Sequence, residues 1–125
     1  IQTQTAKRFE DEKFIDSSSP ISPSIDFIKK NIRESISLKD LSDKACMSTT
    51  SFYRYFKREL GMSPIEYILN EKIKHAKKLL SNPNIHVNEV SYASGFEDCN
   101  YFIRLFKKYE GVTPKQYQLM NFTSH

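Results

Sequence analysis

A pattern of 16 residues occurs twice in this chain, 50 residues apart, and this repeat constrains the fold more than any other feature. The two segments are FYRYFKRELGMSPIEY (52–67) and FIRLFKKYEGVTPKQY (102–117), which agree at 7 of 16 positions where chance would give about one. The identical pairs are Phe52/Phe102, Arg54/Arg104, Phe56/Phe106, Lys57/Lys107, Gly61/Gly111, Pro64/Pro114 and Tyr67/Tyr117. One structural unit is therefore used twice.

Each copy predicts two short helices joined by a tight turn. In the first copy, apolar residues recur at helical spacing after Ser37, and Ser48 is placed to cap a second helix over about 49–60 that ends at Gly61. In the second copy the corresponding cap is Asp98, and the turn before it is one residue longer. The buried faces are expected to carry Leu38, Leu41, Ala45, Phe52 and Phe56 in the first copy and Val87, Val90, Ala93, Phe102 and Phe106 in the second.

Each helix pair is followed by a strong helix start, in which Ser63 or Thr113 precedes a proline and a Glu or Gln completes a capping box. The first start opens a long helix over about 64–80, the second opens a short terminal helix, and another helix over about 23–33 precedes the first copy. The apolar stripe of the long helix is expected to contain Ile65, Leu69, Ile73, Ala76 and Leu80. We expect an all-α fold of about seven helices, with two helix-turn-helix subdomains joined by a long central helix.

The repeat also predicts the domain boundaries. Residues 21–81 are expected to form the first helix-turn-helix unit with the linking helix, and residues 82–121 the second unit. Residues 1–20 are polar and are interpreted as a linker or tail, and residues 122–125 as a tail. No apolar run approaches the roughly 20 residues that span a bilayer, and the N-terminal segment lacks the apolar core of a signal peptide. A cytoplasmic location is therefore expected.

The cysteines and histidines show no spacing that is typical of a metal site. Cys46 and Cys99 form no CxxC pair and are interpreted as reduced thiols, while His75, His86 and His125 have no ligand spacing with one another or with the cysteines. We expect neither a metal nor another cofactor.

Basic residues gather on the second helix of each pair. The formal net charge is +4, and residues 21–125 carry about +5 because 16 basic residues face 11 acidic ones. The clusters are Arg54, Lys57 and Arg58 in the first copy and Arg104, Lys107 and Lys108 in the second. One such cluster is most often a solvated helix face, but two clusters at matching positions favour a nucleic-acid partner.

Two helices joined by a short turn present the second helix to the major groove of DNA. With the phenylalanines turned inward, the predicted base-reading positions are Thr50, Tyr53 and Arg54 in the first copy and Asn100, Ile103 and Arg104 in the second. Arginine can donate two hydrogen bonds to guanine, asparagine can pair with adenine, and apolar side chains can pack on thymine methyl groups. The predicted phosphate contacts are Ser48, Lys57, Arg58, Ser63, Lys107, Lys108 and Thr113. Because the linking helix would be about 25 Å long and DNA repeats every 34 Å or so, the two reading helices are expected about one turn apart on one face of the duplex.

Residues 25–117 resemble the C-terminal domain of the AraC/XylS family of bacterial transcription regulators. The most specific part is GFEDCNYFIRLFKKYEGVTPKQY (95–117), which is similar to the family signature of Gly-Phe, a polar cap, aromatic-Phe, Arg, Phe-Lys, Gly, Thr-Pro and Tyr. The segment LSDKACMSTTSFYRYFKRELGMSPIEYI (41–68) fits the less specific half of the family pattern.

The resemblance implies a seven-helix, two-lobed domain that binds asymmetric promoter sites of double-stranded DNA at the bacterial nucleoid and contacts RNA polymerase to activate transcription. By position, the base contacts of the family fall on Thr50, Tyr53 and Arg54 and on Cys99, Asn100 and Arg104. Lys72 and Gln118 stand where arginine is common in the family, so phosphate or interdomain contacts are not carried over to them. Family members usually have a separate sensing or dimerisation domain, which is expected outside these 125 residues.

Two other classes of function are weighed against DNA binding. An enzyme is not expected, because no phosphate-binding glycine loop, activated nucleophile or convergent carboxylate pair is found in the sequence. A helical protein-interaction module stays open, since helix pairs with basic faces also bind acidic partners. At single positions the alternatives are structural: Arg54 and Arg104 pairing with nearby acids, and Cys99 as a buried thiol. The aromatic residues Phe52, Phe56, Phe102, Phe106, Tyr67 and Tyr117 are expected in the core.

Overall fold

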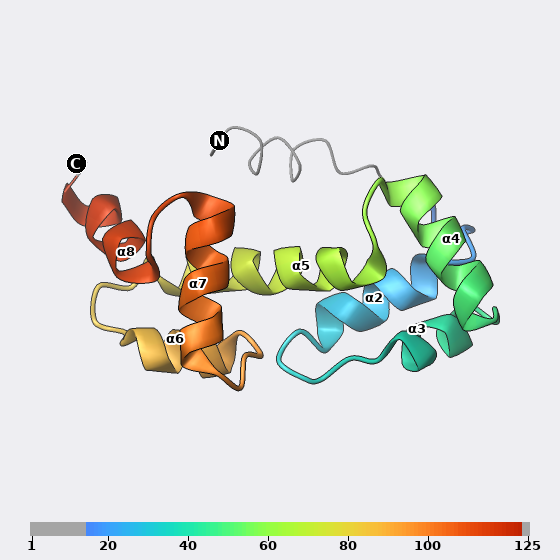
Figure 1. Ribbon diagram of the computed structural model, residues 1–125, viewed down its shortest axis with the longest axis horizontal. Helices are drawn as coiled ribbons and strands as arrows, with labels where there is room; N and C mark the ends of the chain where they lie inside the picture. The colour runs from blue at the N-terminus through green and yellow to red at the C-terminus, as the bar shows by residue number, and fades with distance from the viewer. Residues whose placement is uncertain (1–14, 124–125) are drawn as a thin grey trace. The chain divides into compact units, whose positions relative to one another are not determined.

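The computed structural model describes residues 15–123, and over those residues it contains seven helices and no strand (Figure 1). The helices are α2 (Ser22–Lys30), α3 (Leu38–Lys44), α4 (Thr49–Leu60), α5 (Pro64–Leu79), α6 (Val87–Ala93), α7 (Cys99–Glu110) and α8 (Pro114–Thr123). The expected all-α class is confirmed. Only α2 is clearly shorter than expected, because Asn31 ends it: both its backbone N–H and its side-chain amide donate to the carbonyl of Phe27.

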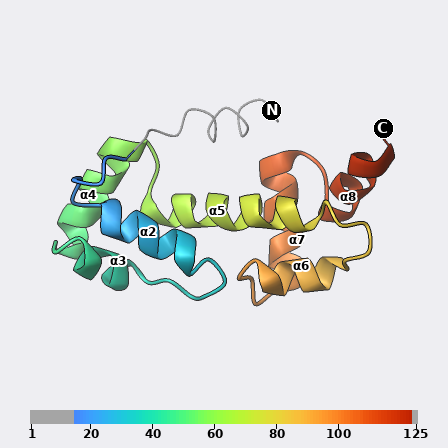
Figure 2. The same cartoon turned by 180° about the vertical axis from the view of Figure 1, so that it is seen from behind.

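The chain divides into two compact units between Glu71 and Lys72, which is inside α5. The first unit contains α2, α3, α4 and the first half of α5, and the second contains the rest of α5 with α6, α7 and α8. Both views show α5 as one unbroken helix (Figures 1 and 2). Each unit has a core of its own.

The core of the first unit forms where α2, α3 and α4 meet. The Phe56 ring lies 5.5 Å from the ring of Phe52 and 5.5 Å from the ring of Tyr67, the latter edge to face. The Ser24 hydroxyl is buried and donates a 2.6 Å hydrogen bond to the carbonyl of Leu41, which ties α2 to α3. The buried apolar residues are Ile21, Ile25, Ile28, Leu41, Ala45, Phe52, Phe56, Met62, Tyr67 and Ile68.

The second unit repeats this arrangement of rings. Phe106 lies 5.8 Å from Phe102 and 5.5 Å from Tyr117, again edge to face. Both phenylalanines are fully buried, as predicted, but Tyr117 is only half-buried. The prediction of Tyr117 as a core residue was therefore too strong: its ring edge packs on Phe106, while the Lys77 ammonium lies 5.8 Å from the ring centroid. The buried apolar residues of this unit are Ile73, Ala76, Leu80, Val90, Phe96, Phe102, Leu105 and Phe106.

The predicted apolar stripe of α5 is wrong at its first position. Ile65 is 50% exposed, whereas Tyr67 and Ile68 are buried. Successive helical residues are 100° apart, so Tyr67 lies about 200° around the helix from Ile65. Once Tyr67 packs against Phe56, Ile65 must face solvent.

Side-chain caps begin the helices where the sequence predicts them. Ser48 Oγ accepts a hydrogen bond from the backbone N–H of Ser51 at 3.2 Å, and Asp98 Oδ1 accepts from the N–H groups of Asn100 and Tyr101. Both expected capping boxes form, with the reciprocal pairs Ser63/Glu66 and Thr113/Gln116. Helix α6 begins with a contact that the sequence pattern did not predict, in which His86 N–H donates to Glu89 Oε1 at 3.0 Å. These contacts satisfy backbone donors that a helix start leaves open.

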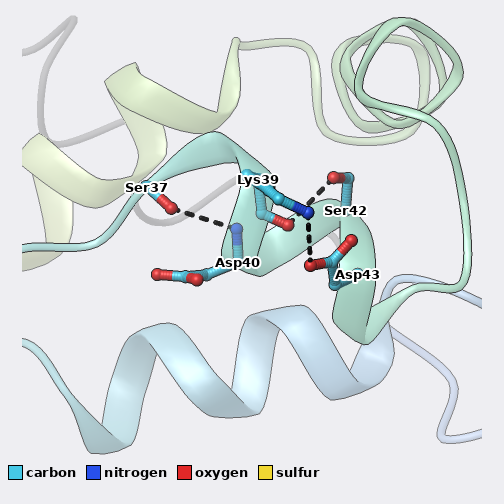
Figure 3. A network of polar contacts seen from close by, with 5 residues as sticks. All are labelled: Ser37, Lys39, Asp40, Ser42 and Asp43. Carbon is cyan, nitrogen blue, oxygen red and sulfur yellow. Dashed lines mark hydrogen bonds and ion pairs between the residues drawn. The ribbon is translucent and has the colours of Figure 1, made fainter.

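Short polar contacts also hold α3, as Figure 3 shows. Ser37 Oγ accepts from the N–H of Asp40 at 3.0 Å, which confirms Ser37 as the cap. Lys39 Nζ lies 3.1 Å from Asp43 Oδ2, and Ser42 Oγ donates to the carbonyl of Lys39 at 3.0 Å. The lysine–aspartate pair is largely exposed, so it contributes little to stability compared with the cap.

The turns of the two helix-turn-helix motifs begin with the same backbone hydrogen bond but have different residues at the position of positive φ. Met47 N–H donates to the carbonyl of Ser42 at 2.9 Å, and Phe96 N–H donates to that of Ser91 at 3.0 Å. In each turn the residue before the donor has a positive φ. This residue is Cys46 (57°) in the first turn and Gly95 (87°) in the second. The Cβ atom makes this conformation unfavourable for cysteine, whereas glycine adopts it freely.

Replacing Cys46 with glycine is therefore expected to raise the free energy of unfolding by about 0.5–1 kcal/mol, because relief of the strained φ outweighs the extra freedom of the unfolded chain. Urea denaturation followed by circular dichroism measures the change. The matched control is Gly95→Ala, which introduces the same strain into the second turn and is expected to lower stability by about 1 kcal/mol. A loss of stability in Cys46→Gly would contradict this account of the turn.

Candidate nucleic-acid interface

Helix α4 presents the first set of predicted base-reading residues to solvent. Phe52 and Phe56 are fully buried, so the opposite side of the helix is exposed. Thr50, Tyr53 and Arg54 lie on that side, with Tyr53 39% exposed. The Arg54 guanidinium forms no hydrogen bond or ion pair with any residue in the described part of the chain. Its five N–H donors are therefore available to an external partner.

Helix α7 presents the second set in a related but different way. Asn100 and Arg104 are exposed, and within residues 15–123 the Arg104 side chain also has no hydrogen-bond or ion-pair partner. Ile103 is half-buried and therefore less exposed than Tyr53, which has the matching position in α4. An isoleucine branches at Cβ and stays close to the helix surface, whereas a tyrosine ring extends beyond it. The structural alternative of acid pairing is thus absent at both arginines in the described residues.

Cys99, the first residue of α7, contacts a residue that the sequence analysis did not single out. Its half-buried thiol donates to Asn88 Oδ1 at 3.0 Å, and Asn88 is exposed on α6. This contact joins the N-terminal ends of the two helices of the second motif. In the sequence, the one feature that pointed to Asn88 was its position in the repeat, because it matches Lys39 near the start of the first helix of the first motif.

The predicted phosphate contacts fall into two groups. The first group consists of exposed cations: Lys57, Arg58, Lys107 and Lys108. Of these, Arg58 has a 3.9 Å contact with Glu59 and its guanidinium lies 5.2 Å from the Tyr55 ring centroid, so it is partly engaged. All four lie in the last turns of α4 and α7, one turn beyond the predicted base-reading positions.

The second group consists of the hydroxyl residues at helix starts: Ser48, Ser63 and Thr113. Each hydroxyl oxygen accepts a backbone N–H of its own helix, at 3.2, 3.1 and 3.1 Å respectively. The backbone N–H groups of Ser63 and Thr113 in turn donate to the side chains of Glu66 and Gln116. What these residues can still offer a phosphate is the hydroxyl hydrogen, because a hydroxyl donates and accepts at once.

Lys72 and Gln118 are buried and hold the second unit together. They stand at the two positions where arginine is common in the AraC/XylS family. Lys72 Nζ donates to the carbonyl of Gly95 at 3.2 Å, so it supports the turn between α6 and α7. Gln118 Nε2 donates to the carbonyls of Asn82 and Ile85, at 3.0 and 2.9 Å, and thereby fixes the loop before α6. Both side chains stabilise the frame that carries α7.

An ion pair holds the C-terminal end of α7. Lys77 Nζ lies 3.1 Å from Glu110 Oε1, and the side chains are 27% and 9% exposed. In the first copy of the repeat the residue matching Glu110 is Leu60, which packs against the apolar core of its unit. The two units therefore secure the same end of their second helix by different chemistry.

Residues 15–123 contain no group of three or more His, Cys, Asp or Glu side chains placed to hold a metal ion. Within the same range, every helix is too short or too polar to traverse a bilayer.

Comparisons with known proteins agree with this geometry. A family described as a helix-turn-helix domain, of the AraC/XylS type, matches residues 41–120. The HTH-type transcriptional regulator YdeC of Bacillus subtilis is 35% identical over 97 residues, which cover 78% of this chain and 33% of YdeC. The chain spans between about a third and a half of the first curated relatives that it matches.

Solved structures show the same fold. The C-terminal domain of the two-component response regulator yesN from Fusobacterium nucleatum superposes with a TM-score of 0.71 at 34% identity, covering 76% of this chain and 93% of that domain. The DNA-binding domain of AdpA has a TM-score of 0.77 at 24% identity and covers 82% and 92%. With the family match over residues 41–120, two helix-turn-helix motifs and relatives that are transcription regulators, the chain belongs to the AraC/XylS family of DNA-binding transcription regulators.

Proposed function

We propose that this chain binds double-stranded DNA sequence-specifically, with α4 and α7 each entering a major groove. The observation that carries the proposal is the pair of repeat-matched arginines, Arg54 and Arg104. Both are exposed, and neither has a hydrogen-bond or ion-pair partner among residues 15–123. An arginine held on a helix that fits the groove can donate two hydrogen bonds to guanine.

The same residues explain how binding would be divided between specificity and affinity. Thr50, Tyr53 and Arg54 read one segment and Asn100, Ile103 and Arg104 the other, with Cys99 at the start of α7. Because the two sets differ, the preferred site is asymmetric. The lysines one turn further on neutralise phosphates, as do Arg58 and the hydroxyls at the helix starts, and these contacts carry no sequence information.

The proposed target is about two turns long. The 16 residues of α5 extend about 24 Å and belong in part to each unit, while one turn of DNA is about 34 Å. One chain would then place its two reading helices in successive major grooves. The solved DNA-binding domain of AdpA, which has this fold, is in complex with a target DNA.

We further propose that the regulator is an activator that contacts RNA polymerase at the bacterial nucleoid. Several relatives carry the name of transcription activator. The first curated relatives are more than twice as long as the matched region, so we assign sensing of the signal or dimerisation to a part of the regulator outside this chain. Activation of a promoter that carries the selected site, in a transcription reaction with purified RNA polymerase, tests this part.

Selection of bound duplexes from a random library tests the central proposal. We expect the selection to enrich one asymmetric site. Binding should weaken when the duplex that carries this site is shortened below about two turns. If Lys57, Arg58, Lys107 and Lys108 each neutralise a phosphate, the logarithm of affinity should fall against the logarithm of salt concentration with a slope of about −3.6. The double variant Arg54→Ala/Arg104→Ala should lose the enrichment while it keeps most of the salt dependence.

A protein-interaction module is the second candidate, since the exposed basic clusters on α4 and α7 also suit an acidic partner. A selection that enriches no sequence, together with salt-dependent binding to an acidic peptide, would favour this candidate and overturn the proposal of sequence-specific DNA binding.

A further inference from the structure

A shallow depression lies beside the N-terminal half of α4. Its volume is about 300 Å³, and its lining consists of Leu38, Thr49, Thr50, Tyr53 and Arg54. Leu38 is the first residue of α3, and the other four belong to the first two turns of α4. The depression therefore lies where the two helices of the first motif come together at their N-terminal ends.

The lining suits a small apolar group next to a polar one. Leucine, the two threonine methyl groups and the tyrosine ring provide apolar surface, and Arg54 is the one charged residue among the five. Thr50, Tyr53 and Arg54 also belong to the residues proposed to read bases. Whatever occupies the depression would thus lie beside the base edge that Arg54 contacts.

The second motif is built differently at the same place. Cys99 matches Thr49 by position, and its thiol contacts Asn88 of α6 at 3.0 Å. Ile103, which matches Tyr53, is half-buried. In the second motif side chains therefore contact each other across the helix starts, whereas in the first motif they line an open depression.

We propose that the depression receives the 5-methyl group of a thymine adjacent to the base that Arg54 contacts, which makes Leu38 a specificity-determining residue. The inference rests on the proposed DNA binding. On the floor of the major groove the thymine methyl group is the apolar feature that distinguishes one base from the others. Leu38 would act from α3, the helix that does not itself read bases, by contributing to the apolar lining together with Tyr53.

Replacing single thymines by deoxyuridine in the selected site tests this inference, because the change removes only the methyl group. We expect one position in the segment bound by α4 to lose about fourfold in affinity, which corresponds to burial of one methyl group. For the Leu38→Ala protein, replacing the same thymine by deoxyuridine should change affinity by less than about 1.5-fold. Both dissociation constants of the uracil-to-thymine ratio are measured with the same protein. If Leu38→Ala lowers the folded fraction of the protein, both constants change by the same factor and the ratio is unaffected.

Two further variants make the test specific. Val87→Ala alters the matching position of the second motif and should leave the fourfold ratio intact. Tyr53→Ala removes another part of the apolar lining and should reduce the ratio as Leu38→Ala does.

The possible failures are distinguishable. Specific binding without a thymine whose methyl group matters in that segment would overturn the inference and leave DNA binding standing. A Leu38→Ala protein that binds more weakly but keeps the fourfold ratio would overturn it too, and would indicate contact with deoxyribose or a purely structural role. Failure to enrich any sequence would overturn the proposed function and this inference together.

Discussion

Arg104→Ala is expected to weaken binding to the selected site by about 1–3 kcal/mol and to relax the preference at a single base pair. Arg104 is exposed on α7, and no partner among residues 15–123 holds its guanidinium, so truncation costs the folded protein little. The loss should fall on the complex, because the base edge that Arg104 contacts loses both of its donors. Dissociation constants for the selected site and its three variants at each position measure the effect.

The matched control is Lys107→Ala, one turn further along the same helix. Lys107 is also exposed, but we propose that its ammonium contacts a phosphate, so its loss should weaken binding to all sequences alike. The salt slope should become shallower by about one for Lys107→Ala. Equal losses on matched and scrambled duplexes for both variants would overturn the division between base-reading and phosphate-binding residues.

Phe106→Ala is expected to lower the free energy of unfolding by about 3–5 kcal/mol. The ring is fully buried and contacts Phe102 and Tyr117 at 5.8 and 5.5 Å, so alanine would leave a cavity between α7 and α8. Chemical denaturation followed by circular dichroism measures the change. Because DNA binding needs α7 in place, the variant should also lose affinity at temperatures where it is partly unfolded.

The repeat supplies a second test of the same argument. Phe56 has the matching ring contacts in the first unit, both at 5.5 Å, so Phe56→Ala should cost a similar 3–5 kcal/mol. Tyr101→Ala is the control on α7, since this ring is 39% exposed and its loss should cost clearly less. A Phe106→Ala protein as stable as Tyr101→Ala would contradict the role of the aromatic core.

Features that depend on residues close together in the chain could be predicted from the sequence alone. The starts of α4, α5, α7 and α8 were predicted correctly, because a cap and the N–H that it accepts are two or three residues apart. The buried faces of α4 and α7 followed from the spacing of four residues between phenylalanines. The exposure of Arg54 and Arg104 on the opposite side follows from the same periodicity.

Features that depend on residues far apart in the chain became apparent only in the folded protein. Periodicity cannot show that Ile65 faces solvent, because that follows from the packing of Tyr67 on Phe56. Nor does it show that Lys72 and Gln118 are used inside the second unit, since their carbonyl partners lie 23 to 36 residues away. The depression beside Leu38 is of the same kind. Its walls come from two helices, and a surface shared by two helices exists only after the chain has folded.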